Sequence, residues 1–233
     1  MSKSEELLTA VKNDAASEVE LHVRDGLVAT GYSKAALQKA LAWASGQGRS
    51  DMVRILLDTG RLSSKSSVAL RKAVEAGCAE CVELLIPASN PKSQNSEALR
   101  LAAELGFIDC VRLLRPCSQL EGTKHHALRI AAVHGHAECV EELARDADDE
   151  ARQQALFNAM AYREAACVEA LLRWTDPRTI GPLGMSAAAH ARASGDRRIL
   201  DIVERWILAS EERAILHEAA RPSESAPGPA SRL

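Results

Sequence analysis

The sequence predicts an all-α solenoid of about seven helix-turn-helix units joined by short inter-repeat loops. A phrase of the form Ala-Leu-x-x-Ala, Gly, Cys-Val-x-x-Leu recurs along the chain, and its glycines lie 29 residues apart each time, at Gly48, Gly77, Gly106 and Gly135. Self-similarity at a period of about 20 to 50 residues is typical of stacked repeats. Aromatic residues make up only 3% of the chain, so alanine and leucine must form the core, which favours thin, closely packed helices.

Each unit is expected to contain two short antiparallel helices, as residues 96–116 illustrate. Ser96 is expected to cap the first helix at its N-terminus, and Leu99 and the alanines after it give that helix one inward face. Gly106 is expected to end this helix, because glycine tolerates the left-handed conformation. A second amphipathic helix follows and closes at Pro116. Neither helix can bury its apolar face alone, so the units must stack.

Weaker copies extend the array at both ends. Ser2 and Glu5 have capping-box spacing at the start of the first unit, and Asp14 and Arg163 stand where the turn glycine would be. The repeat domain is expected over residues 1–213, with units near 4–28, 33–62, 66–94, 95–123, 124–152, 153–180 and 184–213.

The last unit is expected to turn at Gly195 and to end in a long helix, because no Gly or Pro lies between Arg197 and Ala220. Trp206 and Ile207 on this helix would cover the otherwise open end of the core. Residues 214–233 would be a helix extension followed by a disordered tail rich in Pro, Ser and Ala.

Charge and hydropathy argue against several classes of partner. The net charge is −3 and acids alternate with bases, so no basic face for nucleic acid is expected. No stretch is apolar enough for a signal peptide or a membrane span. Four of the six cysteines fall at one repeat position, which indicates packing rather than disulfide pairing. We expect a cytoplasmic protein that is monomeric when unbound, while secretion into a host cell by a non-classical route remains open.

Cysteines and histidines in the central units offer an alternative function, that of a metal-binding protein or enzyme. Cys78-x-x-Cys81 has the spacing of a metal or redox pair, but Cys81 is the core cysteine of its unit and no second pair follows. Zinc requires three or four converging ligands. The histidines that could cluster are His125, His126, His134 and His136.

Packing and punctuation explain these residues more simply, because His134 and His136 flank a repeat turn. Asp148 and Asp149 are expected in a loop over Arg145–Arg152 as a solvated acidic cluster. No phosphate-binding Gly-rich loop, nucleophile elbow or zinc-protease helix occurs in the sequence. We therefore predict no catalytic, cofactor-binding or metal-binding residues, and no cofactor.

The units resemble the ankyrin repeat. His134-Gly135-His136-Ala137-Glu138-Cys139-Val140 is similar to the centre of that repeat, and Leu99-Arg100-Leu101-Ala102-Ala103 to its first helix. The chain departs from the family in lacking the Thr-Pro-Leu-His phrase, with Arg71, Arg100 and Arg129 at the histidine position. Its period of 29 is also shorter than the usual value of about 33. The projecting β-hairpin fingers of the family are therefore expected to be reduced to tight loops.

The resemblance implies a non-catalytic scaffold that binds a protein partner through its concave face, as an effector, an immunity protein or an inhibitor. In the family, partners contact the inter-repeat loops and the exposed ends of the first helices. Leu105, Val133 and Tyr162 are apolar where the repeat does not require it, so we expect an exposed apolar track with Tyr162 as an anchor; the alternative is that these side chains fold over neighbouring repeats. The candidate contact residues are Lys65, Ser67, Glu75, Ser93, Gln94, Glu104, Leu105, His125, Val133, His134, Tyr162 and Arg163.

Overall fold

The fold was analysed in a computed structural model that describes residues 3–13, 15, 34–58, 68–90, 93–118, 123–181 and 184–219. Within these ranges the chain is helical, and the single β-bridge, between Ile180 and Ser186, belongs to no strand. The predicted all-α fold is confirmed. The predictions made for Ser2, Asp14 and the tail beyond Ala219 lie outside the described residues.

The helices follow one another as pairs. A first helix, α1 (Lys3–Lys12), packs against α3, and a short 3-10 turn over Arg115–Cys117 follows α8. The pairs are α3 (Lys34–Gly46) with α4 (Ser50–Leu57), α5 (Val68–Glu75) with α6 (Ala79–Leu85), α7 (Ser93–Leu105) with α8 (Ile108–Leu114), α9 (Thr123–Val133) with α10 (Ala137–Ala144), α11 (Asp149–Ala161) with α12 (Ala165–Leu171), and α13 (Ala187–Ser194) with α14 (Arg197–Ala219).

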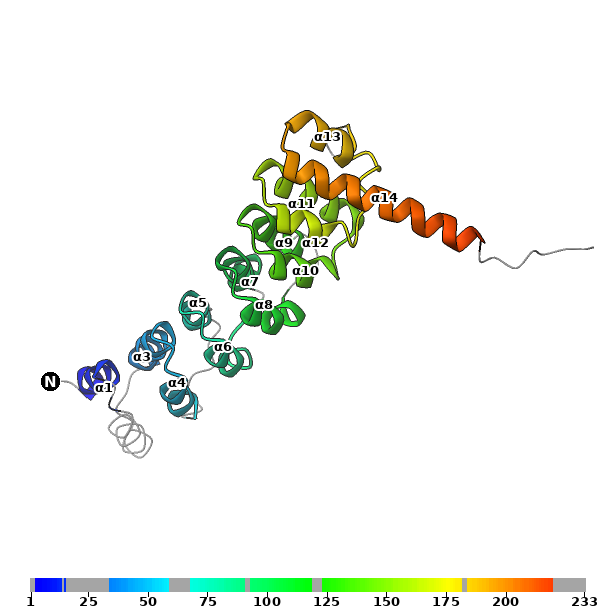
Figure 1. The fold of residues 1–233 in the computed structure, drawn as a ribbon. Helices are drawn as coiled ribbons and strands as arrows, with labels where there is room; N and C mark the ends of the chain where they lie inside the picture. The colour runs from blue at the N-terminus through cyan, green and yellow to red at the C-terminus, as the bar shows by residue number, and fades with distance from the viewer. Residues whose placement is uncertain are drawn as a thin grey trace, which may run out of the picture.

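The pairs stack into two layers, and the molecule is elongated as a result (Figure 1). The first helices, from α1 and α3 to α13, contact one another in sequence order, and the second helices, from α4 to α14, do the same. The core lies between the layers and repeats the same leucine positions in each pair. These fully or almost fully buried leucines are Leu41, Leu70, Leu99, Leu128 and Leu156 in the first layer and Leu56, Leu85, Leu114, Leu143 and Leu171 in the second.

The turn glycines confirm the predicted punctuation. Gly48, Gly77, Gly106 and Gly135 have φ between +66° and +78°, a region that side chains with a Cβ rarely adopt. Arg163, which replaces the glycine in the next unit, is held in the same conformation with φ +63°. The backbone geometry of the turn is therefore kept even where glycine is missing.

Each of these four glycines is also contacted by a side chain from the next unit. A Cβ added at Gly106 would lie 2.4 Å from Nδ1 of His136, and a Cβ at Gly135 would lie 2.4 Å from a carboxylate oxygen of Glu164. At Gly77 the ring of Phe107 approaches to 3.1 Å. The contact is looser at Gly48, where Cys78 Cβ lies 3.6 Å away.

Two local predictions are wrong. Helix α7 begins at Ser93 rather than after Ser96, and Ser96 lies inside it, fully buried with φ +56°. The expected loop over Arg145–Arg152 is shorter, because Asp148 caps α11 by accepting a hydrogen bond from the amide of Ala151 at 2.7 Å.

The C-terminal pair agrees with the prediction. Ser186 caps α13, and Gly195 ends it in the left-handed conformation. Helix α14 is 23 residues long, with Ile199 and Val203 buried and Trp206 and Ile207 packed at the rim of the core. The second half of α14 extends beyond the stacked pairs (Figure 1). Among the described residues, no helix combines the length and the apolar character needed to cross a membrane.

Candidate functional site

An exposed row of side chains crosses the C-terminal ends of the first helices. Each member directly precedes a turn glycine or, in one unit, Arg163. Because α5, α7, α9 and α11 contact one another in order, these ends succeed one another across the layer. Leu105 is 41% exposed and Tyr162 is 60% exposed. We call Ala76, Leu105, His134 and Tyr162, all of them exposed, the helix-end row.

The preceding position behaves differently. Glu75 pairs with Lys72 at 2.5 Å, and Glu104 is exposed. Val133, by contrast, is half-buried rather than exposed. An apolar track was predicted through Leu105, Val133 and Tyr162. Only Leu105 and Tyr162 are exposed, and the unit between them presents His134 instead.

Histidine contacts hold that intervening unit in place. The rings of His134 and His136 stack with their centroids 6.3 Å apart and their planes 9° apart. His136 Nε2 lies 2.9 Å from the main-chain oxygen of Glu104 in the preceding unit, and since a carbonyl can only accept, the imidazole donates there. His134 therefore stacks on a ring that is itself hydrogen-bonded to the unit carrying Leu105.

The remaining predicted contact residues lie apart from one another. His125 Nε2 is 3.5 Å from Oδ2 of Asp148, at the start of the next first helix. Arg163 is exposed, with its Nε 3.9 Å from Oδ2 of Asp196. Lys65 and Ser67 lie outside the described residues, and of Ser93 and Gln94 only the backbone, in the first turn of α7, is described.

The arginines at the family's histidine position do not form a uniform ladder. Arg71 donates from Nη1 to both carboxylate oxygens of Glu97 in the next unit, at 3.0 and 3.1 Å. Arg100 and Arg129 have no such partner among the described residues, and Nε of Arg100 is buried without any hydrogen bond. His126 lies near both; burial first, and then the charges of Arg100 and Arg129, lower its pKa.

The cysteines have the packing role that the repeat predicts. Cys78 caps α6: its thiol accepts from the amide of Cys81 at 3.4 Å and donates to the main-chain oxygen of Gly48 at 3.7 Å. Burial is the largest cause that raises the pKa of the core thiols, to about 11 for Cys110 and Cys139 and to about 12 for Cys167. These thiols are therefore neutral at physiological pH. Within the described ranges, no three His, Cys, Asp or Glu side chains converge as a metal site requires.

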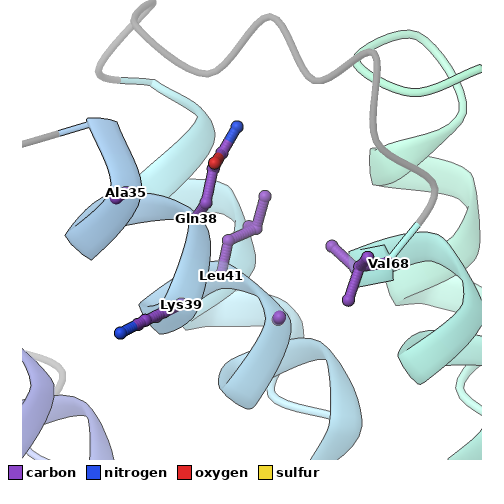
Figure 2. A pocket seen from close by; sticks show the side chains of 7 residues that line it. Ala35, Gln38, Lys39, Leu41 and Val68 are labelled. Atoms are coloured by element: carbon purple, nitrogen blue, oxygen red, sulfur yellow. The ribbon is translucent and has the colours of Figure 1, made fainter.

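A pocket of about 250 Å³ opens between the first helices α3 and α5. Figure 2 shows Gln38 and Leu41 on one wall and Val68 on the other, while Lys39 points away from α5. Alanines 35, 42 and 69 leave the space between the helices. Val68, at the edge of this pocket, is 44% exposed, so the first layer presents apolar surface at α5 as well.

Comparisons with known proteins agree with this geometry. The family model for ankyrin repeats, in three copies, matches residues 41–121, 70–153 and 99–181. Together these overlapping matches span more than half of the chain, so the chain belongs to the ankyrin repeat family. Ankyrin repeats are generally protein–protein interaction modules.

One solved structure shows the same fold. The crystal structure of the human ASB11 ankyrin repeat domain is 22% identical in sequence, with a TM-score of 0.54 over 71% of this chain and 82% of that one. No curated protein matches the chain.

Proposed function

We propose that this protein is a non-catalytic scaffold that binds a protein partner through the face formed by its first helices. The observation that carries the proposal is the exposure of Leu105 and Tyr162 at equivalent positions of the helix-end row, where the repeat itself needs no apolar side chain. Apolar side chains left open in a row, beside polar neighbours, favour a partner contact.

Rigid docking is the mechanism that the scaffold supports. The row is carried by helix ends that the buried leucines and the covered glycines fix in place. A preformed surface loses little conformational entropy on binding, so a modest contact area is enough for a specific complex. Tyr162 would be the anchor, since tyrosine offers a large apolar ring and a hydroxyl at low entropic cost.

The partner class follows from charge as well as from shape. With a net charge of −3 and interspersed acids and bases, the proposal is a protein partner rather than nucleic acid or membrane. In the cell we place the protein in the cytoplasm, monomeric until it binds. Effector, immunity protein and inhibitor are the roles that such a scaffold would serve.

The experiment compares partner capture by two double variants. L105E/Y162E charges the helix-end row, whereas E83K/E169K changes two exposed acids on the second-helix layer. Extracts of the native host are passed over immobilised wild type and both variants, and the proteins retained are identified by mass spectrometry. We expect L105E/Y162E to lose a protein that both wild type and E83K/E169K retain, with all three melting within a few degrees of one another. Equal retention by L105E/Y162E would reject this face.

A further inference from the structure

We propose that Arg100 and Arg129, on the neighbouring first helices α7 and α9, bind an acidic side chain of the protein partner. This arginine site lies on α7 and α9, toward the N-terminal side of the helix-end row. The inference rests on the proposed function, because it names the chemistry that this scaffold recognises in its partner.

The preceding interface between units, formed by α5 and α7, shows which chemical group pairs with an arginine at this position. Between α5 and α7, Arg71 faces Glu97, which directly precedes Ala98 and lies 26 residues further along the chain. Both side chains are about one-third exposed. The carboxylate takes both hydrogen bonds from one guanidinium nitrogen, at 3.0 and 3.1 Å. A carboxylate is thus the native complement of an arginine at this repeat position.

At the next interface between units, formed by α7 and α9, the arginine is present but the carboxylate is not. Arg100 is equivalent to Arg71, and the residue 26 positions further along, directly before Ala127, is His126. The charges of Arg100 and of Arg129, one turn further along α9, both act on His126. Burial first, and then these two charges, lower the pKa of His126, so at neutral pH the imidazole is neutral and the arginines carry the positive charge.

Arg100 is unsatisfied in this arrangement. Its Nε is buried and has no hydrogen-bond partner, and a buried donor without an acceptor costs free energy, while the residue as a whole is half-buried. Arg129 is exposed, so the site is reachable from solvent. A carboxylate placed beside these two side chains would accept charge-assisted hydrogen bonds, which are among the stronger kind.

Among the described residues, no acid forms an ion pair with Arg100 or Arg129, and this includes Glu104, which is exposed one turn further along α7. Glu97 is held by Arg71. Asp148 accepts from the amide of Ala151 and lies 3.5 Å from His125. Glu150 accepts from the side chain of Gln154 at 3.2 Å. We therefore assign the missing carboxylate to the partner, and the helix-end row offers a route: Leu105 is on the same helix as Arg100, about 8 Å further along its axis.

The first test uses a defined probe rather than an unknown partner. The full chain, labelled with ¹⁵N, is titrated with capped tetraglutamate, capped tetraglutamine and inorganic phosphate, and the Nε–Hε signals of the arginines are followed by NMR. We expect tetraglutamate to shift the signals of Arg100 and Arg129 and to leave that of Arg71 unchanged, with no response to tetraglutamine. The absence of a shift at Arg100 and Arg129, or an equal response to phosphate, would overturn the assignment to a carboxylate.

The second test supplies or removes the internal carboxylate. His126→Glu places at this interface the residue that Arg71 already has, so we expect Tm to rise by about 2 °C and the tetraglutamate response to weaken at least about tenfold. The reciprocal variant Glu97→His is the matched control, and it should create a new response at Arg71. Unchanged tetraglutamate binding by His126→Glu would disprove the site.

Failure of this inference and failure of the proposed function give different results. The uncharged variant L105S/Y162S opens the helix-end row without adding charge near the arginine site, so its NMR response to tetraglutamate should equal that of wild type. If L105E/Y162E loses partner capture but wild type shows no response to tetraglutamate, the helix-end row is supported as the binding face and the arginine site is rejected.

Discussion

The turn glycines meet two separate requirements: a positive φ, and space for a side chain of the next unit. Gly106 needs φ +74°, and the space where a Cβ would stand is filled by the ring of His136. That ring in turn binds the main-chain oxygen of Glu104. Gly48 has a similar φ of +68°, but a Cβ added there would lie at an ordinary van der Waals distance of 3.6 Å from Cys78 Cβ. The two positions therefore separate the cost of the backbone conformation from the cost of the contact.

Alanine substitution at the two glycines should show this separation. We expect Gly48→Ala to lower the free energy of unfolding by about 1 kcal/mol, the usual cost of a Cβ in the left-handed region. Gly106→Ala should lower it by about 2–3 kcal/mol, because His136 must also move and give up its hydrogen bond. Urea unfolding followed by circular dichroism measures both values.

A double variant serves as the control for the contact. In the presence of His136→Ala, Gly106→Ala should cost about as much as Gly48→Ala, since the obstructing ring is gone. Equal losses in the two single variants would contradict the role assigned to His136.

At the scale of helices, the start of α11 is defined by one of two adjacent acids. Asp148 accepts from the amide of Ala151 at 2.7 Å and also approaches His125 of the preceding first helix. Asp149, next to it, has its side chain 87% exposed and pairs with Arg152 on its own helix. The two aspartates look alike in the sequence and differ in what they hold.

Substitution of each by alanine should distinguish them. Asp148→Ala removes the N-cap, and we expect a loss of about 1 kcal/mol in the free energy of unfolding. Asp149→Ala removes an exposed pair one turn apart, for which about 0.3 kcal/mol is expected. Chemical unfolding of the two variants under identical conditions measures the difference, and a larger loss for Asp149→Ala would refute the capping role.

Helix positions were predictable from the sequence wherever the repeat imposed them. The register alone placed Arg163 at a left-handed turn position and Gly195 at the end of α13, because each unit must bury the same apolar positions. Helix starts were not predictable in this way: Ser96 looks like a cap, but α7 begins three residues earlier and Ser96 lies buried within it.

The candidate site was predictable only in part. The register indicated that Leu105 and Tyr162 are exposed, since the core does not need them. The half-burial of Val133 depends on how neighbouring helices fit together, which the sequence does not state. Arg71 has a carboxylate partner and Arg100 has a buried Nε without one. This difference depends on the residue that faces each arginine from the next unit, which is known only once the register between units is known.

At the scale of the whole molecule, the C-terminal end of the core is closed by one helix. Helix α14 packs against α12 and α13 and buries Ile199 and Val203. Its later residues, 211–216, are exposed. Stability in a stacked array is close to a sum of unit and interface contributions, so the two halves of α14 should contribute unequally.

Two truncations test this division. Removal of residues 211–233 should leave Tm unchanged to within about 2 °C, because only exposed side chains among the described residues are lost. Removal of 197–233 uncovers α12 and should lower the free energy of unfolding by about 3–5 kcal/mol, the value of two buried aliphatic side chains. Thermal unfolding followed by calorimetry compares the two, and equal melting of both truncations would show that α14 does not close the core.

The covering of each turn glycine also has a direction in time. The side chain that fills the space at Gly77, Gly106 or Gly135 is always supplied by a residue about 30 positions closer to the C-terminus. A growing polypeptide is made from the N-terminus and folds as it leaves the ribosome. We therefore expect each of these three turns to reach its final packing only after the following unit has been synthesised.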